Sequence, residues 1–305
     1  MGWKTFFSLM FIIFAVFLLV FYWFINFETI EFGARNKNFN FSLNDYGADN
    51  IQFYDNMRYL DSNISYNIHK CPLQKKDSMK RAFDLISNLT ILSFYPVLYN
   101  EEISVACESK NKIEDGLFIA GEGGPTNITS TSNFNIILNG GILLIKESDC
   151  ERPNVGLHEL LHALGFDHSS NPNNIMYNVS NCKQVIGDDI TNLINELYSV
   201  PNYPDLSLEN VSAVMHGKYL DVNISIRNNG LMDSGKSNLI IYADDKNIKD
   251  IDLIPIEIGY GRVITLTNLL VMQLDVKTLE IVINSSFNEL NQEDNRIFLE
   301  IKKSI

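Results

Sequence analysis

Basic residues are scarce in this chain of 305 residues. Lysine and arginine together number 24, against 37 aspartate and glutamate residues, which gives a formal net charge of −13. No stretch is rich in lysine or arginine, and a polyanion such as DNA would be repelled by this charge. We therefore exclude nucleic acid as a partner and interpret the acidic surface as one that faces water.

Cysteine is also scarce, and its spacing excludes two further kinds of site. Cys71, Cys107, Cys150 and Cys182 form no C-x-x-C pair, which argues against a cysteine-based zinc site or a redox motif. In an extracellular protein an even number of cysteines indicates two disulfides, for which three pairings exist. A bridge between Cys150 and Cys182 would clamp the histidine-rich region that lies between them. The alternative is four buried free thiols.

The N-terminal region lacks charge over residues 6–27. As a helix with a rise of 1.5 Å per residue, this run would be about 33 Å long, enough to cross the hydrocarbon core of a membrane. It is long for a signal peptide and has no small-residue cleavage site, so we interpret it as a signal anchor; the alternative is a long cleaved signal sequence. Lys4 precedes the run and Glu28 and Glu31 follow it, which predicts a single-pass protein of the cell membrane. Its cytoplasmic tail is then short, residues 1–5, and its body is extracellular.

Sequons for N-glycosylation agree with an extracellular body, although the abundance of asparagine and serine produces some of them by chance. They begin at Asn40, Asn63, Asn88, Asn127, Asn178, Asn210, Asn223 and Asn284.

The chain after the apolar run divides into three parts. Residues 28–50 are polar, rich in asparagine and aperiodic, which indicates a stalk. Residues 51–200 mix short strands with helices, which is typical of an α+β domain. Residues 201–305 begin with two closely spaced prolines and then alternate apolar and polar residues in about seven segments, which predicts an all-β immunoglobulin-like sandwich.

Local patterns predict the elements of the first domain. Helices are expected within the segments 75–89, 154–165 and 188–200. Asp77 is the predicted N-cap of the first of these helices. Residues 123–133, GGPTNITSTSN, predict a turn-rich loop, whereas residues 134–146 predict a hairpin or an edge strand that is broken by Gly140 and Gly141.

Three of the five histidines lie in HELLHALGFDH, residues 158–168. On the predicted helix His158 and His162 are four residues apart and therefore lie on the same face. Zinc accepts imidazole nitrogens at about 2.0–2.1 Å, so this pair supplies half of a tetrahedral site. Gly165 can adopt positive φ, end the helix and allow His168 to reach the same ion.

Three histidines leave the fourth position of zinc for water, which is typical of a catalytic rather than a structural site. Zinc lowers the pKa of that water to near neutrality. Glu159, next to the first histidine, is placed to accept the proton as a general base and to pass it to the departing amine. The alternative, a group of ordinary surface histidines, requires five residue identities at fixed spacing to coincide by chance.

The pattern H-E-x-x-H-x-x-G-x-x-H resembles the zinc signature of the metzincin metalloproteases, and NPNNIMYN is similar to their methionine turn. Ser169, the IMY context and the segment RAFDLISNLTILSFYPV are similar to the matrixin branch, over roughly residues 52–200. The resemblance implies a metzincin-like catalytic domain, with a twisted mixed sheet and an active-site helix. It assigns roles to five residues: His158, His162 and His168 as zinc ligands, Glu159 as the base and Met176 as the hydrophobic floor.

The chain departs from the matrixin pattern in three respects. It has no cysteine switch and too little preceding sequence for a prodomain, which argues against latency through a thiolate on zinc. It lacks the histidines of a second, structural zinc, since His69 and His216 are isolated. Matrixins often carry structural calcium, but no Ca²⁺ ligands can be assigned. We interpret Asp167 as a solvated or helix-end carboxylate and do not assign Tyr177 to the metal.

The C-terminal part resembles the cell-adhesion-related immunoglobulin-like module of bacteria and archaea. The shared features are PDL at its start, VNISIRNNG in the middle and NELNQEDNR before the last strand. This resemblance implies either binding to a cell-envelope ligand or service as a spacer.

These observations predict a membrane-anchored extracellular zinc endopeptidase that hydrolyses peptide bonds of a protein or peptide substrate. The alternative is a cell-surface adhesion or binding protein whose metzincin domain is catalytically inactive. The presence of Glu159 favours the enzyme, because a decayed site has little reason to retain a general base.

Overall fold

The computed structural model describes residues 2–24, 29–34, 51–109, 112–114, 117–146, 150–273 and 276–301. Its helices are α1 (Trp3–Phe24), α2 (Leu73–Leu89), α3 (Asn154–Ala163) and α4 (Asp188–Ser199). Its first strands are β1 (Thr29–Ala34), β2 (Met57–Tyr59), β3 (Asn63–Ile68), β4 (Ser93–Pro96), β5 (Ile103–Cys107), β6 (Lys112–Glu114), β7 (Leu117–Ile119), β8 (Gly121–Ser130) and β9 (Asn135–Leu144). The remaining strands are β10 (Leu206–His216), β11 (Tyr219–Asn228), β12 (Ser237–Ala243), β13 (Lys246–Leu253), β14 (Gly261–Leu270), β15 (Thr278–Ser285) and β16 (Arg296–Ile301).

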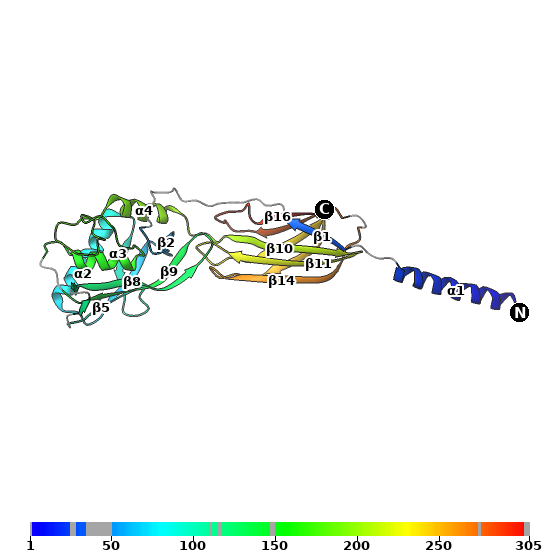
Figure 1. The fold of residues 1–305 in the computed structure, drawn as a ribbon, viewed down its shortest axis with the longest axis horizontal. Coiled ribbons are helices and arrows are strands. Elements are labelled where there is room, and N and C mark those ends of the chain that lie inside the picture. The colour runs from blue at the N-terminus through cyan, green and yellow to red at the C-terminus, as the bar shows by residue number, and fades with distance from the viewer. Residues whose placement is uncertain are drawn as a thin grey trace.

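Helix α1 lies at one end of the molecule, apart from both folded domains (Figure 1). Its described large apolar side chains are exposed, with Phe11 at 73%. Within the described residues, no helix combines the length and the apolar character needed to cross a membrane. The membrane span at residues 6–27 stays a prediction, and its last three residues lie outside the described part of the chain.

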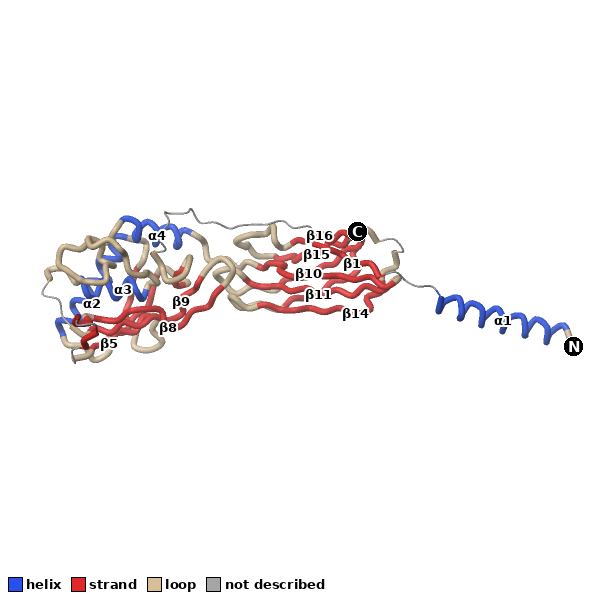
Figure 2. The backbone as a smooth tube through the Cα atoms, in the orientation of Figure 1, coloured by secondary structure: helices blue, strands red, loops and turns tan. Residues whose placement is uncertain are grey.

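The first domain is built on a mixed sheet, as predicted for an α+β domain. Its parallel strands run in the order β2-β9-β5-β3-β4, and β8 pairs antiparallel with β9. Figure 2 shows the helices of this domain gathered beside the sheet. Helix α2 packs against α3 where Met79 and Ala82 approach Gly156. The helices and the sheet share one apolar core, which includes Ile64, Phe83 and Leu160.

Two predictions for the region before the histidines were wrong. Residues 123–133 were expected to form a loop, but most of them belong to β8, whose hydrogen bonds to β9 hold them extended. Residues 134–146 were expected to form a hairpin or an edge strand, yet β9 is a single strand with neighbours on both sides. Gly140 does not break it; a side chain there would overlap the hydroxyl of Tyr59, which donates to the carbonyl of Ala163 at 3.0 Å.

The N-cap prediction for the first long helix was also wrong. Helix α2 begins at Leu73, directly after Pro72, so Asp77 lies within the helix. Proline suits this position because its missing N–H is not needed at the start of a helix. The later helices agree with expectation, since α3 and α4 lie within residues 154–165 and 188–200.

The second domain is all-β, as predicted. Its strands form one continuous antiparallel order, β13-β12-β15-β16-β1-β10-β11-β14. Leu239 and Ile281 belong to strands far from β11 in this order, yet they share a core with Val222 and Ile224. The sheet therefore folds over on itself and encloses the core between two layers, as in a sandwich.

The predicted stalk departs from the structure over residues 29–34. These residues form β1, which pairs antiparallel with β10 on one side and with β16 on the other. The all-β domain therefore includes a strand that precedes the first domain in sequence, because the edges of β10 and β16 offer it backbone hydrogen bonds on both sides. Residues 35–50 of the predicted stalk lie outside the described part of the chain.

The two domains meet at the turn between β8 and β9. Phe134 and Ile136 of the first domain form a small buried cluster with Leu231 of the second. Asn229 accepts a hydrogen bond from the backbone N–H of Ser132 at 3.1 Å. Apolar packing and polar contacts therefore both connect the domains.

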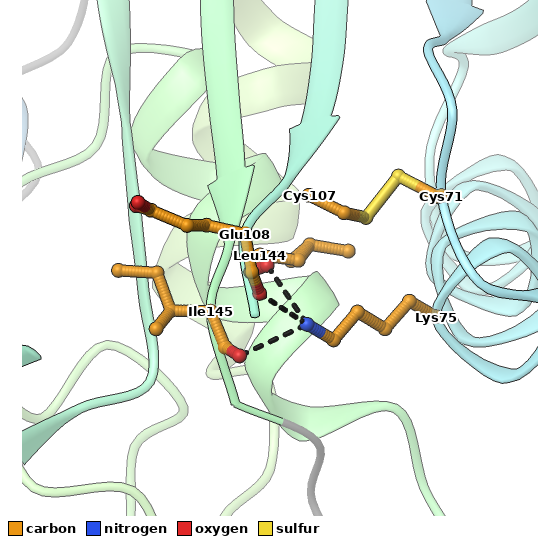
Figure 3. Close-up of a disulfide and its surroundings, with 6 residues drawn as sticks. All are labelled: Cys71, Lys75, Cys107, Glu108, Leu144 and Ile145. Carbon is orange, nitrogen blue, oxygen red and sulfur yellow. Dashed lines mark hydrogen bonds between the residues drawn. A yellow bond between two sulfur atoms is a disulfide. The ribbon is translucent and has the colours of Figure 1, made fainter. Parts of the chain in front are cut away.

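All four cysteines are paired in disulfides, Cys71 with Cys107 and Cys150 with Cys182. The first disulfide joins the start of α2 to the end of β5, and Lys75 lies beside it (Figure 3). The buried Lys75 ammonium donates to three backbone carbonyls, those of Glu108 at 2.8 Å, Ile145 at 2.9 Å and Leu144 at 3.2 Å. These bonds satisfy carbonyl oxygens where the chain leaves β5 and β9.

Candidate metal centre

Helix α3 positions the first two histidines of the cluster. His158 and His162 are four residues apart on this helix, and both are buried. Their Nε2 atoms lie 3.0 Å apart. The helix is anchored by Leu160 and Leu161, which are fully buried in the core. The spacing that the sequence predicts therefore places two imidazoles at one point.

The turn at Gly165 positions the third histidine. Gly165 has φ +97°, the left-handed region that favours glycine, and an added Cβ would lie 2.8 Å from the Cβ of Met57. The chain reverses there, so that the Nε2 of His168 lies 3.2 Å from the Nε2 of His162. The ligand atoms of His158, His162 and His168 all lie within 4.8 Å of one another.

Backbone carbonyls determine which ring nitrogen of the two buried histidines carries the proton. The Nδ1–H of His158 donates to the carbonyl of Ile175, and that of His162 donates to the carbonyl of Phe166, both at 2.7 Å. Burial lowers the pKa of His158, and burial with the neighbouring His158 lowers the pKa of His162 to about 4. Both rings are therefore neutral near pH 7, with lone pairs on their Nε2 atoms.

This arrangement fits a metal ion. Two neutral imidazole lone pairs 3.0 Å apart repel each other unless a cation lies between them. Nitrogen atoms bound tetrahedrally to zinc at about 2.0–2.1 Å are separated by about 3.3 Å, close to the distances found here. The deprotonated nitrogens, their common direction and their spacing therefore all suit zinc.

Glu159 lies on α3 between the two buried histidines and is 5% exposed. Burial raises the pKa of its carboxyl to about 8, and the carboxylate of Glu122 contributes to this rise. In the described part of the chain no hydrogen bond offsets these two effects. The carboxyl group packs closely against β8 at Gly121.

Met176 lies in the turn that supports the histidines and is 1% exposed. Its N–H donates to the side chain of Asn174 at 2.9 Å, and its carbonyl accepts from the N–H of Ser169 at 2.8 Å. The neighbouring Ile175 supplies the carbonyl that orients His158. The methionine turn is thus joined to the histidine segment at two points.

The disulfide Cys150–Cys182 brackets this region. It belongs to one of the three pairings that the sequence analysis left open. Near it, the side-chain amide of Asn154 at the start of α3 donates to the carbonyl of Asn181 at 2.7 Å. The disulfide connects the segment before α3 to the loop after Met176, and the hydrogen bond connects the start of α3 to the same loop.

Two features of the site escape the sequence analysis. Phe53 stacks on the ring of His162, with ring centroids 5.6 Å apart, and its N–H donates to the carbonyl of Gly165 at 3.0 Å. Gly121 and Gly123 allow β8 to approach α3 closely. The sequence pattern around them predicts a loop and gives no specific indication of this contact. The only signal in the sequence is the repeated glycine of GEGG, which is equally typical of a turn.

The isolated histidines lie elsewhere. His69 is exposed and contacts Glu101 at 2.7 Å, and His216 is exposed and lies 3.8 Å from Asp221. Asp167 is exposed and accepts a hydrogen bond from the N–H of the following residue. Among the described residues, the three clustered histidines are the only group of three or more His, Cys, Asp or Glu side chains that could hold a metal ion.

Comparison with known families identifies both domains. Residues 58–199 match the family model Matrixin. This domain is a matrixin domain. Residues 203–297 match the family model CARDB, which confirms the resemblance of the C-terminal part to a cell-adhesion-related module. No curated protein matches the chain. The matrixin domain therefore contains the three histidines, Glu159 and Met176, and the CARDB domain follows it directly.

Proposed function

We propose that the protein is a zinc-dependent endopeptidase whose active site is the histidine cluster of the matrixin domain. The observation that carries the proposal is the convergence of three imidazole Nε2 atoms next to a buried glutamate. The match of residues 58–199 to the matrixins supports it independently.

His158, His162 and His168 would hold the metal through Nε2. Their identity as neutral nitrogen donors suits zinc, and three protein ligands are typical of a catalytic rather than a structural zinc site. Zinc, when bound, supplies Lewis-acid polarisation of the scissile carbonyl and lowers the pKa of water in its coordination shell. The carbonyls of Ile175 and Phe166 hold the two buried rings in the tautomer that this binding requires.

Glu159 acts as the general base. A cation held by the adjacent histidines favours the ionised form of the carboxyl, which opposes the effect of burial on its pKa. The carboxylate accepts a proton from the attacking water and then delivers it to the amine of the departing peptide. Removal of such a group typically lowers the rate by about 10²–10⁴-fold.

The second candidate is a cell-surface binding protein with an inactive matrixin domain. The CARDB match favours it, because the C-terminal part resembles the cell-adhesion-related module of bacteria and archaea. Glu159 favours the enzyme, since a site that only bound metal would have no need of a buried carboxylate beside the ligands.

We further propose that residues 6–27 anchor the protein in the cell membrane, with both domains on the extracellular side. The helical conformation of α1 and the exposure of its described large apolar side chains support the anchor. The two disulfides support an oxidising location such as the cell exterior. The sequons at Asn63 and Asn127 would then be available for glycosylation where the host cell performs it.

The test compares the purified chain with its Glu159→Ala variant. We expect both proteins to contain one zinc ion, measured by elemental analysis, and only the wild type to cleave casein or a quenched fluorescent peptide. Equal cleavage by both proteins, or a wild type that binds no metal and is inert, would refute the enzyme. A wild type that binds zinc but cleaves nothing would favour the binding protein.

A further inference from the structure

Strand β8 and helix α3 approach each other most closely at Glu159. A Cβ added at Gly121 would lie 2.7 Å from Cγ, 2.8 Å from Oε1 and 2.9 Å from Cδ of the Glu159 side chain. A Cβ added at Gly123 would overlap the backbone carbonyl of Glu159. Real Cβ atoms are not found at such distances, so a side chain at either position would displace Glu159.

The neighbouring Gly124 has different surroundings. A Cβ added there would meet no other atom within 4 Å. Gly165, Gly217 and Gly259 are the glycines of the described chain with positive φ, so the backbone of β8 itself accepts alanine at all three of its positions. The effect of alanine at each position therefore depends on what the new methyl group meets.

We infer that Gly121 is a positioning residue for Glu159. The missing side chain at this position leaves the space against β8 in which the Glu159 carboxyl group lies. In the described part of the chain no hydrogen bond contributes to holding this carboxyl, so packing against the strand determines where it points. The inference rests on the proposed function, in which Glu159 is the general base.

The three glycines predict three different outcomes. Gly121→Ala meets only side-chain atoms of Glu159, so it displaces the carboxyl group and leaves the histidines in place. Gly123→Ala meets the backbone of α3, so it forces the helix away from the sheet and disturbs the histidines as well. Gly124→Ala meets open space and serves as the matched control on the same strand.

Peptide cleavage by the zinc-loaded chain measures the consequence for catalysis. Displacement of a catalytic group by about 1 Å can cost about 100-fold in rate. For Gly121→Ala we expect kcat to fall 10- to 100-fold, with KM and zinc content unchanged. For Gly124→Ala we expect kcat within twofold of wild type, and for Gly123→Ala a loss of activity, zinc content and stability together.

Thermal unfolding of the metal-free chain tests the contact without reference to activity. Gly121→Ala should lower Tm in the wild-type background, because its methyl group overlaps Glu159. The same change should leave Tm unaltered in a Glu159→Ala background, because the atoms that it would meet are gone. Such non-additivity is expected only for residues in contact. Gly124→Ala should leave Tm unaltered in both backgrounds.

Two results would overturn the inference: equal kcat for Gly121→Ala and Gly124→Ala, or an equal loss of Tm from Gly121→Ala in both backgrounds. If Gly121→Ala alone fails to fold, the double variant decides, since recovery of folding supports the contact and continued failure refutes it. Failure of the proposed function is recognised separately, because the wild type would then cleave no peptide, whether or not it binds zinc, or would cleave no better than Glu159→Ala. The melting comparison would still test the contact.

Discussion

The ring of His158 donates its Nδ1–H to the backbone carbonyl of Ile175 at a distance of 2.7 Å. This hydrogen bond connects α3 to the methionine turn and leaves the Nε2 of His158 free to bind a metal. The backbone of the turn therefore orients the ring, whereas the side chain of Met176 is buried in the apolar core of the domain. The two roles can be separated by mutation.

Met176→Ala should lower stability more than metal binding. Replacement of a buried methionine by alanine leaves a cavity and typically costs about 2–5 kcal/mol. The carbonyl of Ile175 remains, so zinc content should stay near that of wild type. Denaturant unfolding and elemental analysis measure the two quantities, with Met232→Ala as the control at a methionine that is 53% exposed. Severe zinc loss in a folded Met176→Ala protein would contradict this account.

The two disulfides offer a matched pair for the metal site. They close loops of similar sequence separation, 36 residues for Cys71–Cys107 and 32 for Cys150–Cys182. The chain-entropy account gives each about 3–4 kcal/mol. Replacing either pair by alanine should therefore lower stability by similar amounts.

Only the second disulfide brackets α3 and the methionine turn, so only its removal should weaken zinc binding. Competition with a chromophoric chelator measures the affinity of each double variant at a temperature where both are folded. Equal zinc affinities for the two variants would show that the Cys150–Cys182 bridge has no part in holding the site.

Removal of the metal should destabilise the matrixin domain. A ligand that binds only the folded state stabilises it by about 2.7 kcal/mol at 100 times its Kd. Chelation should therefore lower Tm of the wild type. His168→Ala should abolish this response with little effect on the metal-free protein, because His168 is exposed. His69→Ala, at another exposed histidine, should retain the full response in the same melting experiment.

Lys75→Met should be strongly destabilising although it removes no apolar contact of the lysine stem. The change removes the Lys75 donor from three backbone carbonyls, of which the buried carbonyl of Ile145 is left without its donor, whereas that of Leu144 keeps the N–H of Glu108 (Figure 3). A buried polar group that loses its partner costs about 1–3 kcal/mol. Lys76→Met is the control, since Lys76 is exposed on the same helix. Similar unfolding free energies for the two variants would contradict the role of the ammonium.

The CARDB domain should lose stability as pH rises from about 4 to about 7. Burial raises the pKa of Asp205 to about 6 and that of Asp294 to about 7, with neighbouring carboxylates adding to both shifts. Between the usual aspartate pKa and these values the folded chain binds more protons than the unfolded chain, so stability falls with rising pH. The effect is on the order of a few kcal/mol.

Asp294→Asn should reduce this pH dependence, because an amide does not ionise. Calorimetric melting of the full chain at several pH values, with Asp252→Asn as a control at an exposed aspartate, measures the slope. A stability of the CARDB domain that rises over this pH range would refute the sign of the argument.

Much of the fold follows from short-range patterns. The period of two in the C-terminal part predicts its strands, and apolar residues at helical spacing predict α2 and α4. Two of the wrong predictions concern β8 and β9, where glycine and proline are compatible with either a turn or a strand. Gly-Gly-Pro is typical of a turn, but in β8 the hydrogen bonds to β9 decide the conformation. The same holds for β9, whose glycines make room for Tyr59 and Thr126 rather than ending the strand.

The sequence by itself determined the chemistry of the candidate site. Two histidines and a glutamate at fixed offsets on one helix, followed by a glycine at which the chain turns, specify a metal-binding geometry through local rules alone. Only the tertiary structure decided how β8 leaves room for Glu159, which carbonyls orient the rings, and that β1 joins the distant CARDB domain. These features depend on backbone atoms and empty space contributed by segments far apart in the chain, and the order of the residues gives no unambiguous signal for either.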